Sequence, residues 1–221
     1  MSEWVVDARG GVCNQCENEF QRLAQHWSRN HQCSYPDVGA AQHEAIRGCL
    51  VGDGNLDNPN DGPPALRIAS MRRAHIEWIR DQLGWLVRGV TRDTDGAYRL
   101  RTLSHPTLGR YWTWTDGPPA DWTLTKPIAR LWYACDGGLE WPGSSTQPRA
   151  TWTITDDAKR RACKQALAEQ GYEAMVWDRR LALPFEATER FLAWVGDPTP
   201  GSEHKWAKER EEYERRRGEL S

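Results

Sequence analysis

The same order of helices and strands occurs twice along this chain of 221 residues. Each copy begins with an apolar helix that ends in Asp-Gly, Asp53-Gly54 in the first copy and Asp136-Gly137 in the second. A strand, an amphipathic helix, two strands and a closing helix follow in both copies, and the polar loop after each Asp-Gly has room for one further strand. Such a repeat predicts two α+β halves related by an internal pseudo-two-fold symmetry.

The boundaries of the predicted elements follow from hydrophobic periodicity and turn residues. The first half, residues 42–125, is predicted to hold helices at 45–52, 73–83 and 106–114, and strands at 66–70, 85–92 and 98–103. The second half, residues 126–197, is predicted to hold helices at 127–135, 156–170 and 186–195, and strands at 151–155, 172–178 and 180–184. Residues 1–38 form a separate module, and residues 198–221 form a charged tail that leaves the folded body as a solvated helix.

The first Asp-Gly helix carries two glycines, Gly48 and Gly52, four residues apart and therefore on one face. A glycine inside a helix costs about 1 kcal/mol relative to alanine. Close approach of a second helix accounts for this cost, and Ala134 and Cys135 make the end of the second Asp-Gly helix small as well. We therefore expect the two helices to pack together, with Gly48, Gly52 and Ala134 at their interface.

Side-by-side packing of these helices brings Asp53 and Asp136 together. The carboxyl end of a helix carries negative partial charge, so an acid there is unfavourable by about 0.3–1 kcal/mol. A cation such as Mg²⁺ removes the repulsion, since it binds carboxylate, carbonyl and water oxygens. We predict a Mg²⁺ site at Asp53 and Asp136, with the preceding Gly52 and Cys135, suited to phosphodiester hydrolysis. A plain cap turn is the alternative for each Asp-Gly.

The two segments resemble the paired signature of the LAGLIDADG homing endonucleases. Gly48, Gly52, Asp53 and Gly54 match its first copy, and residues 131–139, with Asp136 and Gly137, match its second. The resemblance, to the single-chain type with two motifs, covers residues 42–197. It implies two αββαββα halves with saddle-like antiparallel sheets and a central two-helix interface.

This resemblance implies site-specific cleavage of both strands of DNA, in the service of intron or intein mobility. Asp53 and Asp136 would each ligate metal, and a monomer would act on a long non-palindromic target. Members of the family also place a Lys or Gln near the acids, for which Lys126 and Arg179 are the candidates here. The alternative function is a non-cleaving nucleic-acid binder on the same scaffold, either an RNA maturase-like protein or a DNA-binding regulator.

Polar side chains alternate with apolar ones along the predicted strands. Arginine and threonine dominate these polar positions, and a sheet that presents them fits the major groove of DNA. The alternative is a sheet face that contacts only solvent. The candidate DNA contacts are Arg67, Arg99 and Arg101 in the first half, and Arg149, Thr151, Thr153, Thr155 and Arg179 in the second.

The N-terminal module contains a CxxC knuckle, Cys13 and Cys16, of the kind that presents two thiolates to tetrahedral Zn²⁺. His26 and Cys33 complete the preferred ligand set, and His31 in place of Cys33 is the alternative. The stretch resembles small zinc modules attached to mobile-element endonucleases. A module of this size lacks a core of its own, so zinc would supply most of its stability. Its role is either to extend the DNA contact or to support the body.

The composition excludes some classes of protein. The formal charge of −2 gives no sign of nucleic-acid binding, yet the positive charge is almost all arginine, whose planar fork donates two hydrogen bonds at once. No apolar run is long enough for a membrane span and no signal peptide is visible, so we expect a cytoplasmic protein. Cys49, Cys135 and Cys163 stand singly in apolar stretches and are expected to be buried thiols in a reducing compartment.

Overall fold

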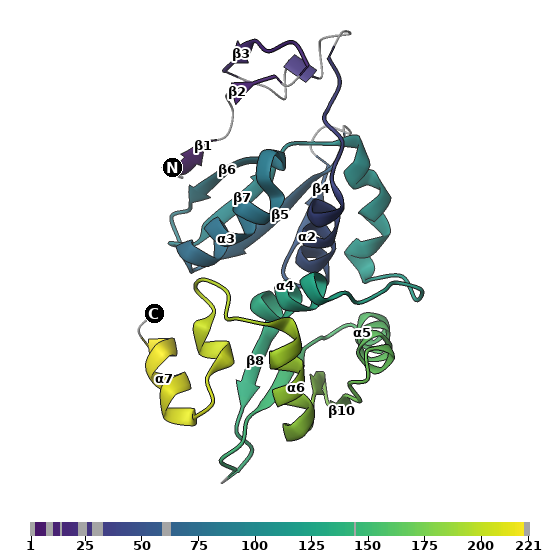
Figure 1. The fold of residues 1–221 in the computed structure, drawn as a ribbon, viewed down its shortest axis with the longest axis vertical. Coiled ribbons are helices and arrows are strands. Elements are labelled where there is room, and N and C mark those ends of the chain that lie inside the picture. Colours follow the sequence, from purple (N-terminus) through teal and green to yellow (C-terminus); the bar gives the residue numbers. More distant parts are fainter. Residues whose placement is uncertain are drawn as a thin grey trace. The chain divides into compact units, whose positions relative to one another are not determined.

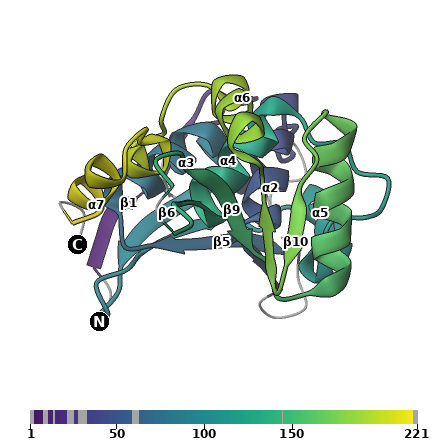
Figure 2. The same cartoon turned by 90° about the horizontal axis from the view of Figure 1, so that it is seen from below.

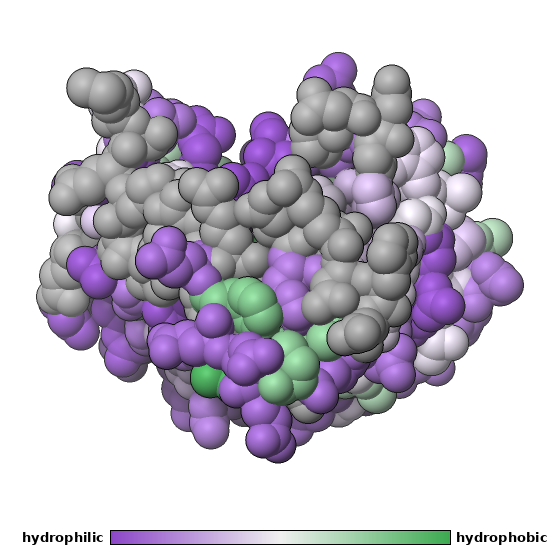
Figure 3. Space-filling view, turned by 90° about the horizontal axis from the view of Figure 1, so that it is seen from above, coloured by the Kyte–Doolittle hydropathy of each residue, from purple (hydrophilic) through white to green (hydrophobic). Residues whose placement is uncertain are grey.

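The computed structural model describes residues 3–7, 11–13, 15–21, 26–27, 33–58, 63–143 and 145–218 (Figure 1). Its internal contacts divide the chain into two compact units. Unit 1 contains residues 1–46 and 54–112, and unit 2 contains residues 47–53 and 113–221. None of the helices described is long and apolar enough to cross a lipid bilayer. Hydrophilic residues make up most of the coloured surface in Figure 3.

Unit 1 is built on a five-stranded antiparallel sheet in the order β1-β6-β7-β5-β4. A short hairpin of β2 and β3 lies in the N-terminal segment. The elements are β1 (Glu3–Asp7), β2 (Gly11–Val12), β3 (Glu19–Phe20), α2 (Ala40–Val51, whose residues from Arg47 onward belong to unit 2), β4 (Asn55–Asp57), β5 (Ala65–Ser70), α3 (Arg73–Leu83), the 3-10 turn η2 (Gly84–Leu86), β6 (Val87–Arg92), β7 (Tyr98–Thr102) and the 3-10 helix η3 (Pro106–Asp116).

One face of the unit 1 sheet is covered by α3, which contacts β5, β6 and β7 (Figure 1). The helix buries Ile76, Ile79 and Leu83, which lie three or four residues apart and so share one face. It ends where Gly84 adopts a φ of +54°, a conformation that favours glycine. Along β5 and β7 the side chains alternate, with Leu100 buried and its neighbour Arg99 exposed. The second face of the sheet is therefore polar and open.

Unit 2 holds a four-stranded antiparallel sheet in the order β10-β11-β9-β8. Helices α4 and α6 pack on it, and α5 lies beside the hairpin of β10 and β11 (Figures 1 and 2). The elements are α4 (Lys126–Asp136), β8 (Gly137–Glu140), β9 (Arg149–Thr153), α5 (Asp157–Glu169), β10 (Met175–Trp177), β11 (Arg180–Ala182), α6 (Phe185–Val195), the 3-10 turn η4 (Glu203–Trp206) and α7 (Arg210–Gly218).

Aromatic side chains fill the core between α4, α6 and β9. The rings of Trp132 and Trp152 stack with centroids 4.9 Å apart, and Tyr133 and Phe191 meet both the sheet and each other edge to face. All four side chains are almost completely buried. Large rings contribute much of the buried apolar area of a small unit, which explains how a chain with modest overall hydrophobicity holds this core.

The predicted fold class is confirmed, since the order αββαββα occurs in both halves. The further strand after each Asp-Gly is present as β4 and β8. Several element types and boundaries differ, of which three are examples. Residues 84–86 form a 3-10 turn before β6, the helix predicted at 106–114 is a 3-10 helix, and the strand predicted at 172–178 contains only residues 175–177. Strand β1, which no prediction anticipated, adds an edge to the first sheet.

The C-terminal segment does not leave the folded body at residue 198, so this expectation is wrong. Thr199, Ser202, Lys205 and Ala207 are all buried. Ala207 packs against Leu139 of β8 and against Trp141, the residue that follows β8. The turn η4 folds back over this strand and so brings Ala207 to it. The solvated part of the tail is α7, which buries no residue.

The end of α2 packs closely against α4 in unit 2, as the two glycines predict. A Cβ atom added at Gly48 would lie 2.8 Å from the Cβ of Leu131, and one added at Gly52 would lie 2.7 Å from the Cβ of Cys135. Real Cβ atoms do not approach one another this closely. The absence of a side chain at both positions therefore sets the distance between the helices.

We expect Gly48→Ala to lower the free energy of unfolding, by about 1–3 kcal/mol, because the added methyl group overpacks the interface. Helix propensity alone predicts the opposite sign, a gain of about 1 kcal/mol. Urea unfolding of the metal-free protein measures the difference. Gly109→Ala is the matched control, because nothing lies within 4 Å of the added Cβ there. A Gly48→Ala variant as stable as the native protein would contradict the close contact.

Candidate functional site

Two carboxyl groups meet at the ends of the packed helices. Asp136 is the last residue of α4, and Asp53 follows α2 by two residues. Their side chains lie close enough to interact directly, by hydrogen bonding and by charge repulsion. Burial, and then this hydrogen bond and the repulsion from Asp53, raise the pKa of Asp136 from 3.8 to about 8. Two neighbouring carboxylates repel each other, and a divalent cation, which binds carboxylate oxygens, would remove this repulsion.

Two lysines partly offset this negative charge. The ammonium groups of Lys159 and Lys205 both favour the ionised form of Asp136 and so lower its pKa. Lys205 is 8% exposed, and its Nζ donates hydrogen bonds to the carbonyl oxygens of Ala134 at 2.7 Å and Cys135 at 2.8 Å. These are carbonyls of the last turn of α4, where a cation is favourable. Lys205 therefore caps the carboxyl end of α4, the helix whose last residue is Asp136.

The segment around Lys205 is fixed to α4 by further contacts. The hydroxyl of Tyr133 donates to the carbonyl of Lys205 at 2.8 Å, and the Tyr133 ring meets Trp206 with centroids 5.0 Å apart. The indole of Trp206 donates to the carbonyl of Gly196 at 2.8 Å. The position of Lys205 is thus determined by aromatic packing as well as by its own hydrogen bonds.

The two sequence candidates for a basic residue near the acids lie elsewhere. Lys126 is the first residue of α4, about 15 Å of helix away from Asp136 at 1.5 Å per residue. Arg179 lies in the turn between β10 and β11. Lys159 and Lys205, rather than these two residues, are the basic residues whose charge acts on Asp136. A signal was present in the sequence, since lysine occurs at five positions only and these are two of them.

Gly52 and Cys135, the other residues assigned to the metal, flank the acids as expected. The carbonyl of Cys135 accepts its hydrogen bond from Lys205 and keeps a second lone pair. The thiol of Cys135 stays protonated, because burial and the neighbouring Cys49, Asp53 and Asp136 raise its pKa. The assignment of these two residues to metal stays a prediction.

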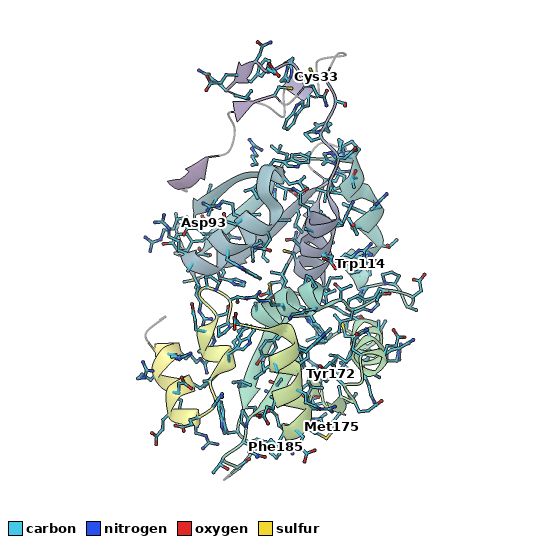
Figure 4. All side chains as sticks on the ribbon, viewed as in Figure 1. Cys33, Asp93, Trp114, Tyr172, Met175 and Phe185 are labelled. Carbon is cyan, nitrogen blue, oxygen red and sulfur yellow. The ribbon has the colours of Figure 1, made fainter. Side chains whose placement is uncertain are left out.

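A second candidate centre gathers Cys13, Cys16, His26 and Cys33, whose ligand atoms all lie within 4.8 Å of one another (Figure 4 labels Cys33). Burial alone would raise the pKa of the Cys13 thiol, but hydrogen bonds from the backbone of Gln15 and Cys16 and from His26 lower it to about 6. Burial and the two neighbouring sulfurs raise the pKa of Cys33 to about 11. Three crowded thiols and an imidazole fit tetrahedral Zn²⁺. The alternative ligand His31 lies outside the described residues.

The N-terminal cluster shares a core with the body of unit 1. Cys13, Trp27 and Cys33 are buried together with Leu103, which follows β7. The Trp27 ring meets the edge of Trp85, with centroids 5.7 Å apart. This module is therefore packed on the first half of the repeat, in agreement with a supporting role.

The arginines predicted for DNA contact in unit 1 lie on the open face of its sheet, and each has an acidic partner. Arg67 and Arg101 both pair with Asp57, the latter at 3.3 Å. Arg99 pairs with two acids of the turn before β7, Asp93 at 2.7 Å and Asp95 at 3.1 Å. The guanidinium groups are held in place but remain partly exposed.

In unit 2 the predicted contacts are more dispersed. Thr151 and Thr153 share a face of β9, whereas Thr155 lies beyond the end of the strand. The expected row of three strand threonines is therefore a row of two. The guanidinium of Arg149 lies over the ring of Phe185, 4.6 Å from its centroid. Arg179 occupies the hairpin turn.

Comparison with known proteins identifies the fold. No protein-family model matches the sequence, and no curated protein matches it. The solved structure of the homing endonuclease I-WcaI bound to its DNA recognition sequence matches with a TM-score of 0.67 at 12% identity, over 84% of this chain and 92% of that one. The N-terminal LAGLIDADG domain of WhiA matches at 0.49 and 10% identity (80% and 88% covered), and I-DmoI with DNA and Mn at 0.44 and 13% (70% and 96%). The chain therefore has the fold of I-WcaI.

We expect Asp136→Asn to stabilise the metal-free protein by about 0.5–2 kcal/mol at pH 8–9. The folded-state pKa of Asp136 lies above its unfolded value, so ionisation of this carboxyl costs the native protein stability as the pH rises from 3.8 to about 8. The gain in the variant should be absent at pH 4 and greatest above pH 8, as measured by thermal unfolding in EDTA.

Asp93→Asn is the control for this experiment and has the opposite sign. Hydrogen bonds from the backbone of Thr94 and from Arg99 lower the pKa of Asp93, so its ionised form stabilises the fold at neutral pH. The Asn variant should unfold at a lower temperature than the native protein. A pH-independent effect of Asp136→Asn would contradict the contact between the two acids.

We also expect the purified protein to contain one Zn²⁺ per chain, and Cys13→Ser and Cys33→Ser to lose it, as measured by elemental analysis. Unfolding of unit 1 should begin at a lower temperature in both variants, because Trp27 and Cys33 contribute to its core. Cys163→Ser, at a buried thiol of α5, is the control that retains the metal. Full zinc content in Cys13→Ser and Cys33→Ser would exclude this ligand set.

Proposed function

We propose that this protein is a site-specific DNA endonuclease that hydrolyses both strands with divalent metal held by Asp53 and Asp136. The observation that carries the proposal is the meeting of these two carboxyls at the ends of closely packed helices. Nothing in the packing requires acids there, and their mutual repulsion lowers stability. A function that needs a cation at this point accounts for the cost.

The residues around the acids have separable roles in this proposal. Asp53 and Asp136 would hold Mg²⁺, which supplies an activated water and stabilises the charge that develops on phosphate. Lys205 holds the last turn of α4 in position and so orients Asp136. Lys159 and Lys205 add positive charge beside the acids, where a DNA phosphate would also be attracted.

The open faces of the two sheets are the proposed DNA-binding surfaces. I-WcaI, whose fold this chain shares, was solved on its DNA recognition sequence. Arginine and threonine on such faces donate to base edges and phosphates. The two halves lie in one chain but carry different side chains, so we propose that a monomer binds a long, non-palindromic target. The zinc module then supports the unit 1 sheet at the segment after β7.

The test is cleavage of DNA that spans the uninterrupted insertion site of the protein's own gene. With Mg²⁺ we expect specific double-strand cuts, lost in EDTA and reduced more than about 100-fold in Asp53→Asn and in Asp136→Asn, since both acids hold the metal. Binding of the same DNA, measured by gel shift, should persist in both variants. Asp81→Asn, at an exposed acid of α3 on the opposite face of the unit 1 sheet, should cut normally.

Uncut DNA that is nevertheless bound tightly and specifically would overturn cleavage in favour of a non-cleaving binder on the same scaffold. Specific binding to the intron RNA would then separate a maturase-like protein from a DNA-binding regulator. If the protein bound neither DNA nor RNA, both the endonuclease function and the alternative of a non-cleaving nucleic-acid binder would be overturned.

A further inference from the structure

The open face of the unit 1 sheet carries a row of arginines on adjacent strands. Arg67 of β5 lies directly opposite Arg101 of β7. Arg101 in turn lies opposite Gly89 of β6, where the register shifts at a β-bulge that contains Arg88. Bulges of this kind redirect a side chain, and Arg88 is exposed. Alternation along β6 does not predict Arg88 on this face, because the bulge breaks the strict alternation of the strand.

Positive charge is in excess along this row. Asp57 pairs with both Arg67 and Arg101, so one carboxylate serves two guanidinium groups. Burial lowers the pKa of Arg101, Asp57 raises it, and the nearby charges of Arg67 and Arg88 lower it further. Arg67 and Arg101 share one carboxylate and Arg88 adds a third positive charge near Arg101, which leaves donors and charge for an acceptor-rich partner.

The open face of the unit 2 sheet has a different character. Thr153 of β9 lies opposite Arg180 of β11, which lies opposite Trp177 of the edge strand β10. Two residues away along β9, Thr151 lies opposite Ala182 of β11, which lies opposite Met175 of β10, the residue that Figure 4 labels. Trp177 is 44% exposed and Met175 is 40% exposed. This face therefore presents methyl groups and large apolar side chains, and its Arg180 is paired with Glu140 at 3.4 Å.

These two surfaces fit different base pairs. The planar fork of arginine donates two hydrogen bonds to O6 and N7 of guanine, whereas a threonine methyl or an apolar side chain packs on the C5 methyl of thymine. We propose that the target is asymmetric in composition, with a guanine-rich segment bound by unit 1 and a thymine-rich segment bound by unit 2. Arg67, Arg88 and Arg101 select the first, and Thr153, Met175 and Trp177 select the second.

This proposal rests on DNA binding by the open sheet faces, and it adds which bases each face selects. The exposed apolar residues of β10 also fit it better than a protein partner. Met175 and Trp177 share their face with threonines and with Arg149 and Arg180, which are groups that contact DNA, and the edge strand itself is only three residues long. A short edge offers little for pairing with a strand of another chain.

The experiment selects bound sequences from a pool of randomised DNA duplexes, with the full-length, zinc-loaded protein in buffer without Mg²⁺ so that no cleavage occurs. We expect one motif with a guanine-preferring segment and a separate thymine-preferring segment. Arg88→Ala and Arg101→Ala should reduce guanine preference by about 5- to 150-fold at individual positions of the first segment and leave the second unchanged. Arg73→Ala, on the helix that covers the opposite face, is the matched control.

A second measurement tests the methyl contacts directly. Replacement of thymine by deoxyuridine in the second segment removes only the C5 methyl, and should weaken binding of the native protein. The same replacement should have a smaller effect on Thr153→Ser, which keeps the hydroxyl and lacks the methyl, and on Trp177→Ala. Both changes are at exposed side chains, and unchanged thermal unfolding establishes that the variants are folded.

The outcomes separate the two levels of the proposal. Absence of binding to any duplex would overturn the proposed function, and with it base selection by the sheets. Specific binding with equal guanine and thymine preferences in both segments, or deoxyuridine substitution without effect, would overturn the inference alone.

Discussion

The contact between α2 and α4 determines where the two acids Asp53 and Asp136 meet. Gly48 and Gly52 let α4 approach until Leu131 and Cys135 occupy the space that side chains would take. Asp53 and Asp136 come directly after the residues of this contact. The close packing of the helices therefore also brings the two carboxyl groups together, where they repel each other. Burial, and then the hydrogen bond and the charge of Asp53, raise the pKa of Asp136. The repulsion between the carboxyls lowers the stability of the metal-free protein, and a cation bound between them would remove this loss.

The C-terminal segment supplies a positive charge, Lys205, that offsets the negative charge at the end of α4 in the metal-free protein. The helix end of α4 combines carbonyl dipoles with a carboxyl group, and Lys205 faces both. A buried lysine needs its donors satisfied, and the carbonyls of Tyr133, Ala134 and Cys135 in the last turn of α4 provide the acceptors. The turn η4, held by Tyr133 and Trp206, is thus part of the site although it lies far along the chain.

The sequence was sufficient for features that depend on local pattern. Helical spacing located α3, and the glycines and the Asp-Gly pairs predicted the packed helices and the meeting of their acids. Features that depend on tertiary contacts could not be predicted in this way. Lys205 lies in a charged segment whose composition resembles a solvated tail, and only contact with the end of α4 gives it a role. Arg88 follows from a register shift that alternation along a single strand does not reveal.

The difference between the two sheet faces follows from the same distinction between core and surface. On each sheet, burial fixes every second residue, as with Leu100 in β7 and Trp152 in β9, because the helices must pack there. The residues between them have no such requirement, so the open face of each half is free to differ while the scaffold stays the same. One face has become rich in arginine and the other in threonine and apolar groups. A repeated fold in a single chain therefore permits two unlike open surfaces, which a symmetric dimer of identical halves does not.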